Sequence, residues 1–362
     1  MRWRVIGLLL AAVAAITSCG GIAVLEIDPA GASSATGTLP DPTLDCPQGR
    51  ADCDGLAENG CEIDLAGDAT SCGVCGHGCQ GGPCQSGLCQ PVIVASGQGY
   101  AYRLAATETA VYWTTSDGSV LRAPASGAPE ILAQGQNSPG DLAVDESRVY
   151  WANLGDGTIV SAPLGGGAIA VVVPNAGQAW SLAVSATTLS WTDNKTGDVR
   201  ALALVGNGPP ILLATTPGAW AIAMDSTRVY WSTLFAGAVL SAPIGGGPTT
   251  TLVSGFTAPG DLALAGDRLF FGTGNDAGVH AVPIAGGVLT TLAATGGFGI
   301  AADEHHVYFG DYDGRLARVP LAGGEPEVIG IGPGTPTDLA LSSTTVYWAA
   351  AAMDGLILKV AK

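Results

Sequence analysis

Short apolar runs separated by turns rich in glycine and aspartate recur from residue 91 to the end of the chain. Each repeat contains one run that ends in an aromatic residue, such as Val149-Tyr150-Trp151. The third position of this anchor run returns every 38 to 40 residues, at positions 113, 151, 191, 231, 271, 309 and 348. A period of this length fits four short strands, as in the blades of a β-propeller.

The repeat over residues 141–173 illustrates the four predicted strands, at 141–144, 148–151, 158–162 and 168–173. Asp156-Gly157 separates the second run from the third, and Asp-Gly between β-rich runs is a strong hairpin signal. Apolar residues stand at adjacent positions within the runs, as expected for strands buried on both faces between neighbouring blades. We therefore interpret the aromatic anchors as packing residues between blades.

The two ends of the repeat region predict how the ring closes. The last repeat stops at its third run, residues 356–360, and the matching fourth run, residues 92–95, stands at the start of the region. Pairing these two segments would leave neither edge without a partner. The sequence thus predicts an all-β fold, a seven-bladed β-propeller of four-stranded blades. An open stack of sheets is the alternative, and it leaves the split repeat unexplained.

The anchor runs resemble the YWTD repeat of low-density-lipoprotein-receptor propellers, and Trp191-Thr192-Asp193 is the nearest match. The repeat region is thus similar to YWTD-like and NHL-like propellers. The YWTD family has six blades and a firm Asp, which most repeats of this chain lack. The resemblance implies a propeller fold and does not imply a ligand.

A cluster of cysteines precedes the repeats. Eight cysteines, an even number, fall in a segment too short to bury a core. They predict four disulfides, and the sequence leaves their pairing open. The stretch from Cys53 to Gly76 resembles cysteine-rich modules of secreted bacterial proteins. A metal site at Cys72, Cys75, His77 and Cys79 is the alternative reading of the spacing. The eight cysteines are Cys46, Cys53, Cys61, Cys72, Cys75, Cys79, Cys84 and Cys89.

The first nineteen residues indicate export. Two arginines precede an apolar run over residues 5–16, which is too short to span a bilayer and is typical of a signal peptide. The run ends in Ile16-Thr17-Ser18-Cys19, which resembles the bacterial lipobox and implies a signal peptide over 1–18 with lipidation of Cys19. Ordinary secretion is the alternative. Gly20 after the cysteine favours the outer membrane or cell surface.

The regions that follow the signal peptide define the expected domain organisation. Residues 19–45 carry no apolar periodicity and are expected to form a flexible tether. Residues 46–90 are expected to form the disulfide-rich module, and residues 91–362 the propeller.

Composition excludes two classes of protein. Lys and Arg total 14 against 31 Asp and Glu, a net charge of −17. A nucleic-acid partner is therefore not expected, because a phosphate backbone requires a basic face. Only 12% of residues are charged and 47% are hydrophobic, which excludes a mostly disordered chain.

The mouth of the ring, at the start of each first strand, is the predicted binding site. Aromatic faces beside carboxylates suit sugar rings or a peptide segment. The alternative is that these residues only wedge the blades together and cap turns. Trp180 and Trp220 are the strongest candidates, because they stand in consecutive repeats outside the anchor series. The candidate ligand-binding residues are Tyr102, Arg103, Asp141, Trp180, Trp220, Asp261, Phe298 and Asp338.

These features predict an exported, lipid-anchored, monomeric protein whose propeller is a binding or scaffolding module for an extracellular glycan or protein. Neither a cofactor nor a metal is expected, although the Asp-Gly turns offer oxygen ligands that could suit calcium. The alternative is an enzyme acting on an extracellular carbohydrate or lactone through Asp141, Asp261 and Asp338. The sequence contains no nucleophile elbow, zinc-protease helix, P-loop or dinucleotide fingerprint.

Overall fold

The computed structural model describes residues 46–362, except residues 57, 274–277 and 352–354. The chain divides into two units, Met1–Thr43 and Leu44–Lys362, and the described residues belong to the second. Cys19, with the expected signal peptide and tether, lies outside the described residues. In the described part, no helix is long and apolar enough to cross a bilayer.

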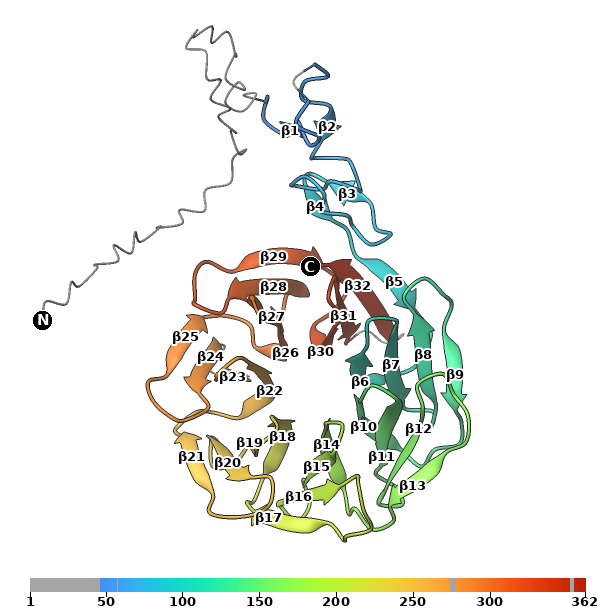
Figure 1. Ribbon diagram of the computed structural model, residues 1–362, viewed down its shortest axis with the longest axis vertical. Helices are drawn as coiled ribbons and strands as arrows, with labels where there is room; N and C mark the ends of the chain where they lie inside the picture. Colours follow the sequence, from blue (N-terminus) through green and yellow to red (C-terminus); the bar gives the residue numbers. More distant parts are fainter. Residues whose placement is uncertain (1–45, 57, 274–277, 352–354) are drawn as a thin grey trace, which may run out of the picture. The chain divides into compact units, whose positions relative to one another are not determined.

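The repeats form seven four-stranded antiparallel sheets, which confirms the predicted propeller (Figure 1). The first strands of successive blades contact one another in cyclic order, and the seventh returns to the first. Blade 1 comprises β6 (Ala101–Ala106), β7 (Ala110–Thr115), β8 (Val120–Pro124) and β9 (Glu130–Ala133). Blade 2 comprises β10 (Pro139–Val144), β11 (Arg148–Asn153), β12 (Thr158–Pro163) and β13 (Ala170–Val173). Blade 3 comprises β14 (Ala179–Val184), β15 (Thr188–Asp193), β16 (Asp198–Ala203) and β17 (Ile211–Thr215).

The remaining blades repeat this order of strands. Blade 4 comprises β18 (Ala219–Met224), β19 (Arg228–Thr233), β20 (Ala238–Pro243) and β21 (Thr250–Val253). Blade 5 comprises β22 (Pro259–Ala265), β23 (Arg268–Thr273), β24 (Gly278–Pro283) and β25 (Thr290–Ala293). Blade 6 comprises β26 (Phe298–Ala302), β27 (His306–Gly310), β28 (Arg315–Pro320) and β29 (Glu327–Ile331). Blade 7 comprises β30 (Pro336–Leu341), β31 (Thr345–Ala350), β32 (Leu356–Ala361) and β5 (Val92–Ala95).

Blade 7 is assembled from both ends of the repeat region, as predicted. β5 pairs antiparallel with β32, with Ala95 opposite Ile357 and Ile93 opposite Leu358. The N-terminal strand therefore supplies the outer strand of the last sheet. The pairing gives the hydrogen-bonding groups of β32 a second neighbour, so the ring closes through backbone hydrogen bonds and side-chain packing together.

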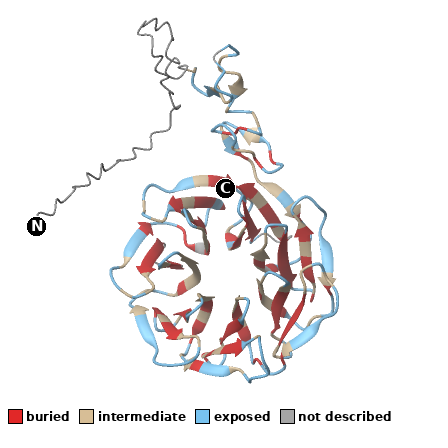
Figure 2. Ribbon diagram, in the orientation of Figure 1, coloured by how far each residue is buried: buried red, intermediate tan, exposed pale blue. Residues whose placement is uncertain are grey.

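The aromatic anchors form the core between blades, which confirms their predicted packing role. Trp151 of blade 2 is fully buried with Tyr112 and Val120 of blade 1. Trp113 of blade 1 packs in the same way with Tyr347 of blade 7, so the contact continues across the closure. Figure 2 shows the consequence, with buried residues on the inner and middle strands and exposed residues on the outermost strands.

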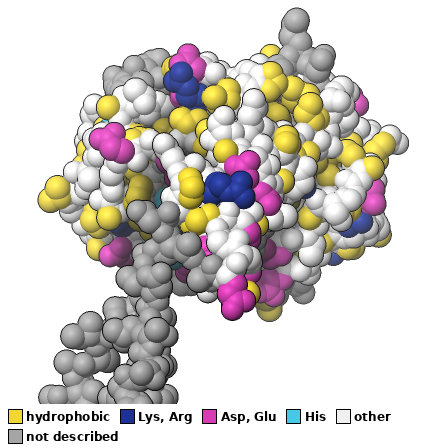
Figure 3. All heavy atoms as spheres, turned by 90° about the horizontal axis from the view of Figure 1, so that it is seen from above, with side chains coloured by type: hydrophobic (Ala, Val, Ile, Leu, Met, Phe, Trp, Pro, Cys, Tyr) yellow, Lys and Arg dark blue, Asp and Glu magenta, His cyan; other side chains and the backbone are white. Residues whose placement is uncertain are grey.

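The outer surface of the ring is weakly charged. The view in Figure 3 shows mostly uncharged and hydrophobic side chains, with acidic groups scattered among fewer basic ones. On the outer strands, Ile131 and Val171 are exposed as well. These outer strands are short, four or five residues each, which limits the length of free edge available for pairing with another chain.

An aspartate at the turn between first and second strands fixes an anchor tyrosine in three blades. Tyr150 donates its hydroxyl hydrogen bond to Asp145 at 2.9 Å, and Tyr230 donates to Asp225 at 2.6 Å. Tyr308 donates to Asp303 in the same way. Burial, and then the carboxylate of Asp145, raise the pKa of Tyr150 to about 12, so this phenol remains a donor at neutral pH.

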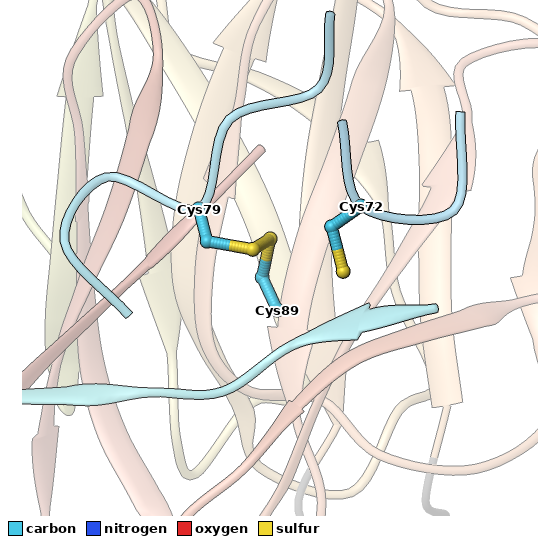
Figure 4. A group of neighbouring side chains, drawn as sticks. All are labelled: Cys72, Cys79 and Cys89. Atoms are coloured by element: carbon cyan, nitrogen blue, oxygen red, sulfur yellow. A yellow bond between two sulfur atoms is a disulfide. The ribbon is translucent and has the colours of Figure 1, made fainter. Parts of the chain in front are cut away.

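The cysteine-rich segment contains four disulfides, as predicted. Its short strands are β1 (Arg50–Ala51), β2 (Ile63–Asp64), β3 (Cys84–Gln85) and β4 (Leu88–Cys89). Figure 4 shows the Cys79–Cys89 bond with Cys72 beside it. The alternative metal site at Cys72, Cys75, His77 and Cys79 is wrong, because each of its sulfurs is bonded to another sulfur. The bonds are Cys46–Cys61, Cys53–Cys75, Cys72–Cys84 and Cys79–Cys89.

Reduction is expected to loosen the cysteine-rich segment selectively. Every cysteine lies at or before residue 89, and the propeller is held by sheet pairing and blade packing instead. Each disulfide typically contributes about 2–4 kcal/mol to a small domain. After treatment with dithiothreitol, hydrogen exchange should accelerate for amides of residues 46–89 and stay slow in the buried second strands. Equal acceleration in both regions would contradict this division.

Removing one anchor should destabilise the propeller strongly. Trp231 is fully buried with Val199 and Leu213 of the preceding blade, so Trp231→Ala leaves a large cavity. The expected loss in the free energy of unfolding is about 3–5 kcal/mol. Chemical denaturation measures it, with Val205→Ala as the control, because Val205 is 75% exposed and should cost less than about 0.5 kcal/mol. A loss below about 1 kcal/mol for Trp231→Ala would contradict the packing role.

Candidate functional site

A β-bulge in each first strand places the predicted site residues. The pairing of first and second strands shifts register near the start of every blade, for example between Pro139 and Leu142. The residues between those two points are Gly140 and Asp141. Bulges redirect side chains and are common beside functional sites. The same shift surrounds Arg103, Trp180, Trp220 and Asp261.

Arg103 crosses the central channel. Its Nη1 atom lies 3.2 Å from Oδ1 of Asp261, so an ion pair joins the first strand of blade 1 to that of blade 5. Burial opposes the charge on Arg103, but Asp261, Asp141 and Asp338 together hold its pKa above the ordinary value. The guanidinium is therefore the shared counter-charge of three carboxylates.

Asp141 and Asp338 also connect neighbouring blades. Asp141 accepts a 2.7 Å hydrogen bond from the backbone N–H of Leu182 in blade 3. Asp338 accepts a 2.6 Å hydrogen bond from the N–H of Leu104 in blade 1. Each aspartate also accepts the N–H of the residue that follows it. These two carboxylates therefore help to hold the ring together. This is the structural role that the sequence analysis gave as the alternative to ligand binding.

Asp141 and Asp338 resist ionisation. Burial raises the pKa of Asp141, although Arg103 and the hydrogen bond from Leu182 act in the opposite direction. Burial also raises the pKa of Asp338, to about 8, and the negative charges of Asp261 and Asp141 add to the effect. Arg103 counteracts these influences without cancelling them. Three carboxyl groups thus share one guanidinium, and burial shifts two of them, Asp141 and Asp338, toward the protonated form.

A cavity of about 440 Å³ adjoins this charged group. Its walls come from blades 1, 2, 3 and 7, and include loops that enter first strands or join second strands to third strands. The cavity combines an indole, two apolar side chains, three hydroxyls, a guanidinium and a carboxylate. Its lining residues are Arg103, Ser116, Ser138, Pro139, Gly140, Asp141, Leu154, Trp180 and Thr337.

Trp180 and Trp220 lie against each other at the mouth. Their ring centroids are 4.5 Å apart and their planes are inclined by 41°. Trp180 lines the cavity, whereas Trp220 supports it from the side. The Nε1 atom of Trp180 is buried and has no hydrogen-bond partner among the described residues. A buried indole N–H usually has an acceptor, so this donor is available to a bound group.

The structure thus brings most of the predicted residues together. Arg103, Asp141, Asp261 and Asp338 form one electrostatic group, and Trp180 joins Arg103 and Asp141 around the cavity. The backbones of Tyr102 and Phe298 lie in β6 and β26, and their side chains fall outside the described part of the structure.

Three exposed aromatic residues on the same face were missed by the sequence analysis. Tyr100, Phe235 and Tyr312 are the exposed aromatic residues of the described part, at 58%, 83% and 64%. All three occupy loops at the mouth end of the blades. A bulky aromatic residue between turn residues was the available signal, as in Asp311-Tyr312-Asp313-Gly314.

Two of the Asp-Gly turns on this face, at Asp117 and Asp156, are stabilised by hydrogen bonds from their own residues. Oδ1 of Asp117 accepts hydrogen bonds from the hydroxyl of Thr115 and the N–H of Ser119. Oδ1 of Asp156 accepts equivalent bonds from Thr158. These turns therefore form without an ion, and the calcium alternative gains no support from them.

The comparisons with known proteins concern the fold. No protein-family model matches the sequence, and no curated protein matches it either. Among solved structures, a streptogramin B lyase is similar at 10% identity, with 75% of this chain and 97% of that chain covered and a TM-score of 0.62. A catalytically inactive virginiamycin B lyase from Staphylococcus aureus with quinupristin is similar at 13% identity, covering 75% and 98%, with a TM-score of 0.62.

A nidogen/laminin complex is similar at 17% identity, covering 60% of this chain and 91% of that chain, with a TM-score of 0.50. At these identities the similarity extends to the fold and not to the activity. The chain is thus a seven-bladed β-propeller whose fold is shared by proteins that bind other proteins and by enzymes.

Proposed function

We propose that this protein is an exported, lipid-anchored binding module that recognises an extracellular glycan or protein at the mouth of its propeller. The observation that carries the proposal is the cavity of about 440 Å³ beside Trp180, Arg103 and Asp141. Binding sites of this kind are concave, mostly apolar and supplied with a few converging polar groups. We also propose the expected boundaries within the unit Leu44–Lys362, namely a disulfide-rich module over 46–90 and the propeller over 91–362.

The distribution of exposed aromatic side chains supports the same face. Tyr100, Phe235 and Tyr312 surround the mouth, whereas the exposed aliphatic residues Val205 and Val288 lie on turns at the opposite end of the blades. Aromatic residues contribute large contact areas at low entropic cost, and they are enriched where proteins bind partners. The mouth face therefore combines a cavity with a surrounding contact surface.

The geometry favours binding over hydrolysis. A pair of catalytic carboxylates needs space between them for a scissile bond or an attacking water. Here Arg103 occupies the channel and contacts Asp261, while Asp141 and Asp338 accept backbone hydrogen bonds from adjacent blades. The three carboxylates that an enzyme would need for hydrolysis are therefore already held by contacts within the protein.

The disulfides support export, because such bonds persist in oxidising compartments.

Lipidation of Cys19 is tested directly by metabolic labelling with an alkyne-tagged fatty acid. The label should enter the wild-type protein and be lost in Cys19→Ser, since the thiol is the acceptor in the lipobox. Labelling that survives Cys19→Ser would contradict the anchor.

Substitution of the mouth tryptophans should abolish ligand binding. The full chain and its Trp180→Ala and Trp220→Ala variants are screened on glycan and peptide arrays. Trp180→Ala removes a cavity wall, and Trp220→Ala removes its support, so the affinity for a bound ligand should fall at least about tenfold in each.

Val288→Ala is the control, because Val288 is 84% exposed on the opposite end of blade 5. Far-ultraviolet circular dichroism checks that all variants retain their strands. If binding is unchanged in both tryptophan variants, the mouth is not the binding site.

A further inference from the structure

Three carboxyl groups and one guanidinium form the charged group beside the cavity. Asp141, Asp261 and Asp338 surround Arg103, and no other basic side chain is among the groups that act on Asp338. Buried charges are costly unless they are paired. Three carboxyl groups share this one guanidinium, so the site has room for further positive charge.

The cavity above this group has an apolar wall. Pro139, Leu154 and Trp180 line it. The same lining holds Asp141 and also Arg103, whose guanidinium pairs with Asp261. An apolar wall that ends at a carboxylate matches a side chain with an aliphatic stem and a cationic tip. An indole face adds attraction for an ammonium group placed over it.

We propose that the mouth cavity binds an alkylammonium group, supplied by a lysine side chain of a protein partner. The aliphatic stem packs against Leu154 and Trp180, and the ammonium group pairs with Asp141. This inference rests on the proposed function, because it names the ligand chemistry of the same site.

Other ligand classes fit the lining less well. An anionic sugar or phosphate would meet the carboxylates of Asp141 and Asp261, which offset the attraction of Arg103. A neutral sugar supplies no positive charge to pair with Asp141. An amino sugar supplies the cation, but its ring hydroxyls would lie against Pro139 and Leu154, which offer them no side-chain partner.

Binding of a cation should release a proton. Asp338 has a pKa of about 8, raised by burial and by the neighbouring charges, so most molecules hold this proton at pH 7. The charged groups acting on Asp338 are Arg103, Asp261 and Asp141. A positive charge entering beside them stabilises the ionised form and lowers the pKa of Asp338. A neutral ligand lacks this effect.

Titration calorimetry of the full chain with two matched small molecules tests the proposal. The first is Nα-acetyl-lysine amide, and the second is Nα-acetyl-norleucine amide, which keeps the aliphatic stem and lacks the ammonium group. Measurements at pH 7 in buffers of different ionisation enthalpy count the protons released. The lysine compound should bind at least about tenfold more tightly and release about 0.5 to 1 proton per site.

Two variants locate the effect. Trp180→Ala should weaken binding of the lysine compound at least about tenfold, whereas Val288→Ala should leave it unchanged. Asp338→Asn should abolish proton release, because the amide has no proton to lose near neutral pH. This variant keeps an acceptor oxygen for the N–H of Leu104 and is checked for its fold by circular dichroism.

Several outcomes would overturn the inference. Equal affinities for the lysine and norleucine compounds, or no binding of the lysine compound up to about 10 mM, would exclude an alkylammonium site. Tighter binding of glucosamine than of the lysine compound would assign the cavity to amino sugars instead. A neutral glycan that binds in a Trp180-dependent manner would also reject the inference, yet it would leave the proposed function intact.

Discussion

Packing of one aromatic anchor per blade against the preceding blade is the contact on which the whole molecule depends. Trp113, Trp151 and Trp231 each fill the space between two sheets, and each is fully buried. No sheet can bury both of its faces alone, so every blade requires two neighbours. Closure follows from the same requirement, because Trp113 of blade 1 completes its packing against Tyr347 of blade 7.

This requirement explains why the mouth is rich in unusual side chains. The second strands are filled with packing residues, whereas the start of each first strand departs from regular pairing through its bulge. Side chains at the bulge therefore lie outside the regular pairing of the first two strands. They vary from arginine to aspartate to tryptophan between blades, while the anchors barely change.

Much of the fold could be predicted because it is encoded locally and then repeated. The anchor run, the Asp-Gly turns and the displaced fourth strand each occupy a few adjacent residues. Boundaries were less accurate: β10 begins at Pro139, two residues before the predicted start, because the bulge interrupts the apolar pattern there.

The ion pair between Arg103 and Asp261 could not be predicted, since it joins residues 158 positions apart. The disulfide pairing was equally inaccessible, because the spacing of eight cysteines is compatible with many connectivities.

The carboxylate of Asp141 links the two roles of the mouth. It lines the cavity, and it also holds the backbone of Leu182 in the next blade. A ligand that pairs with this carboxylate therefore acts on a group that already holds two blades together. Because Arg103 is shared with Asp261 and Asp338, the same ligand also changes the electrostatics of blades 1, 5 and 7. Under the proposed function, recognition at the mouth and cohesion of the ring would depend on one set of charges, and a change to one would affect the other.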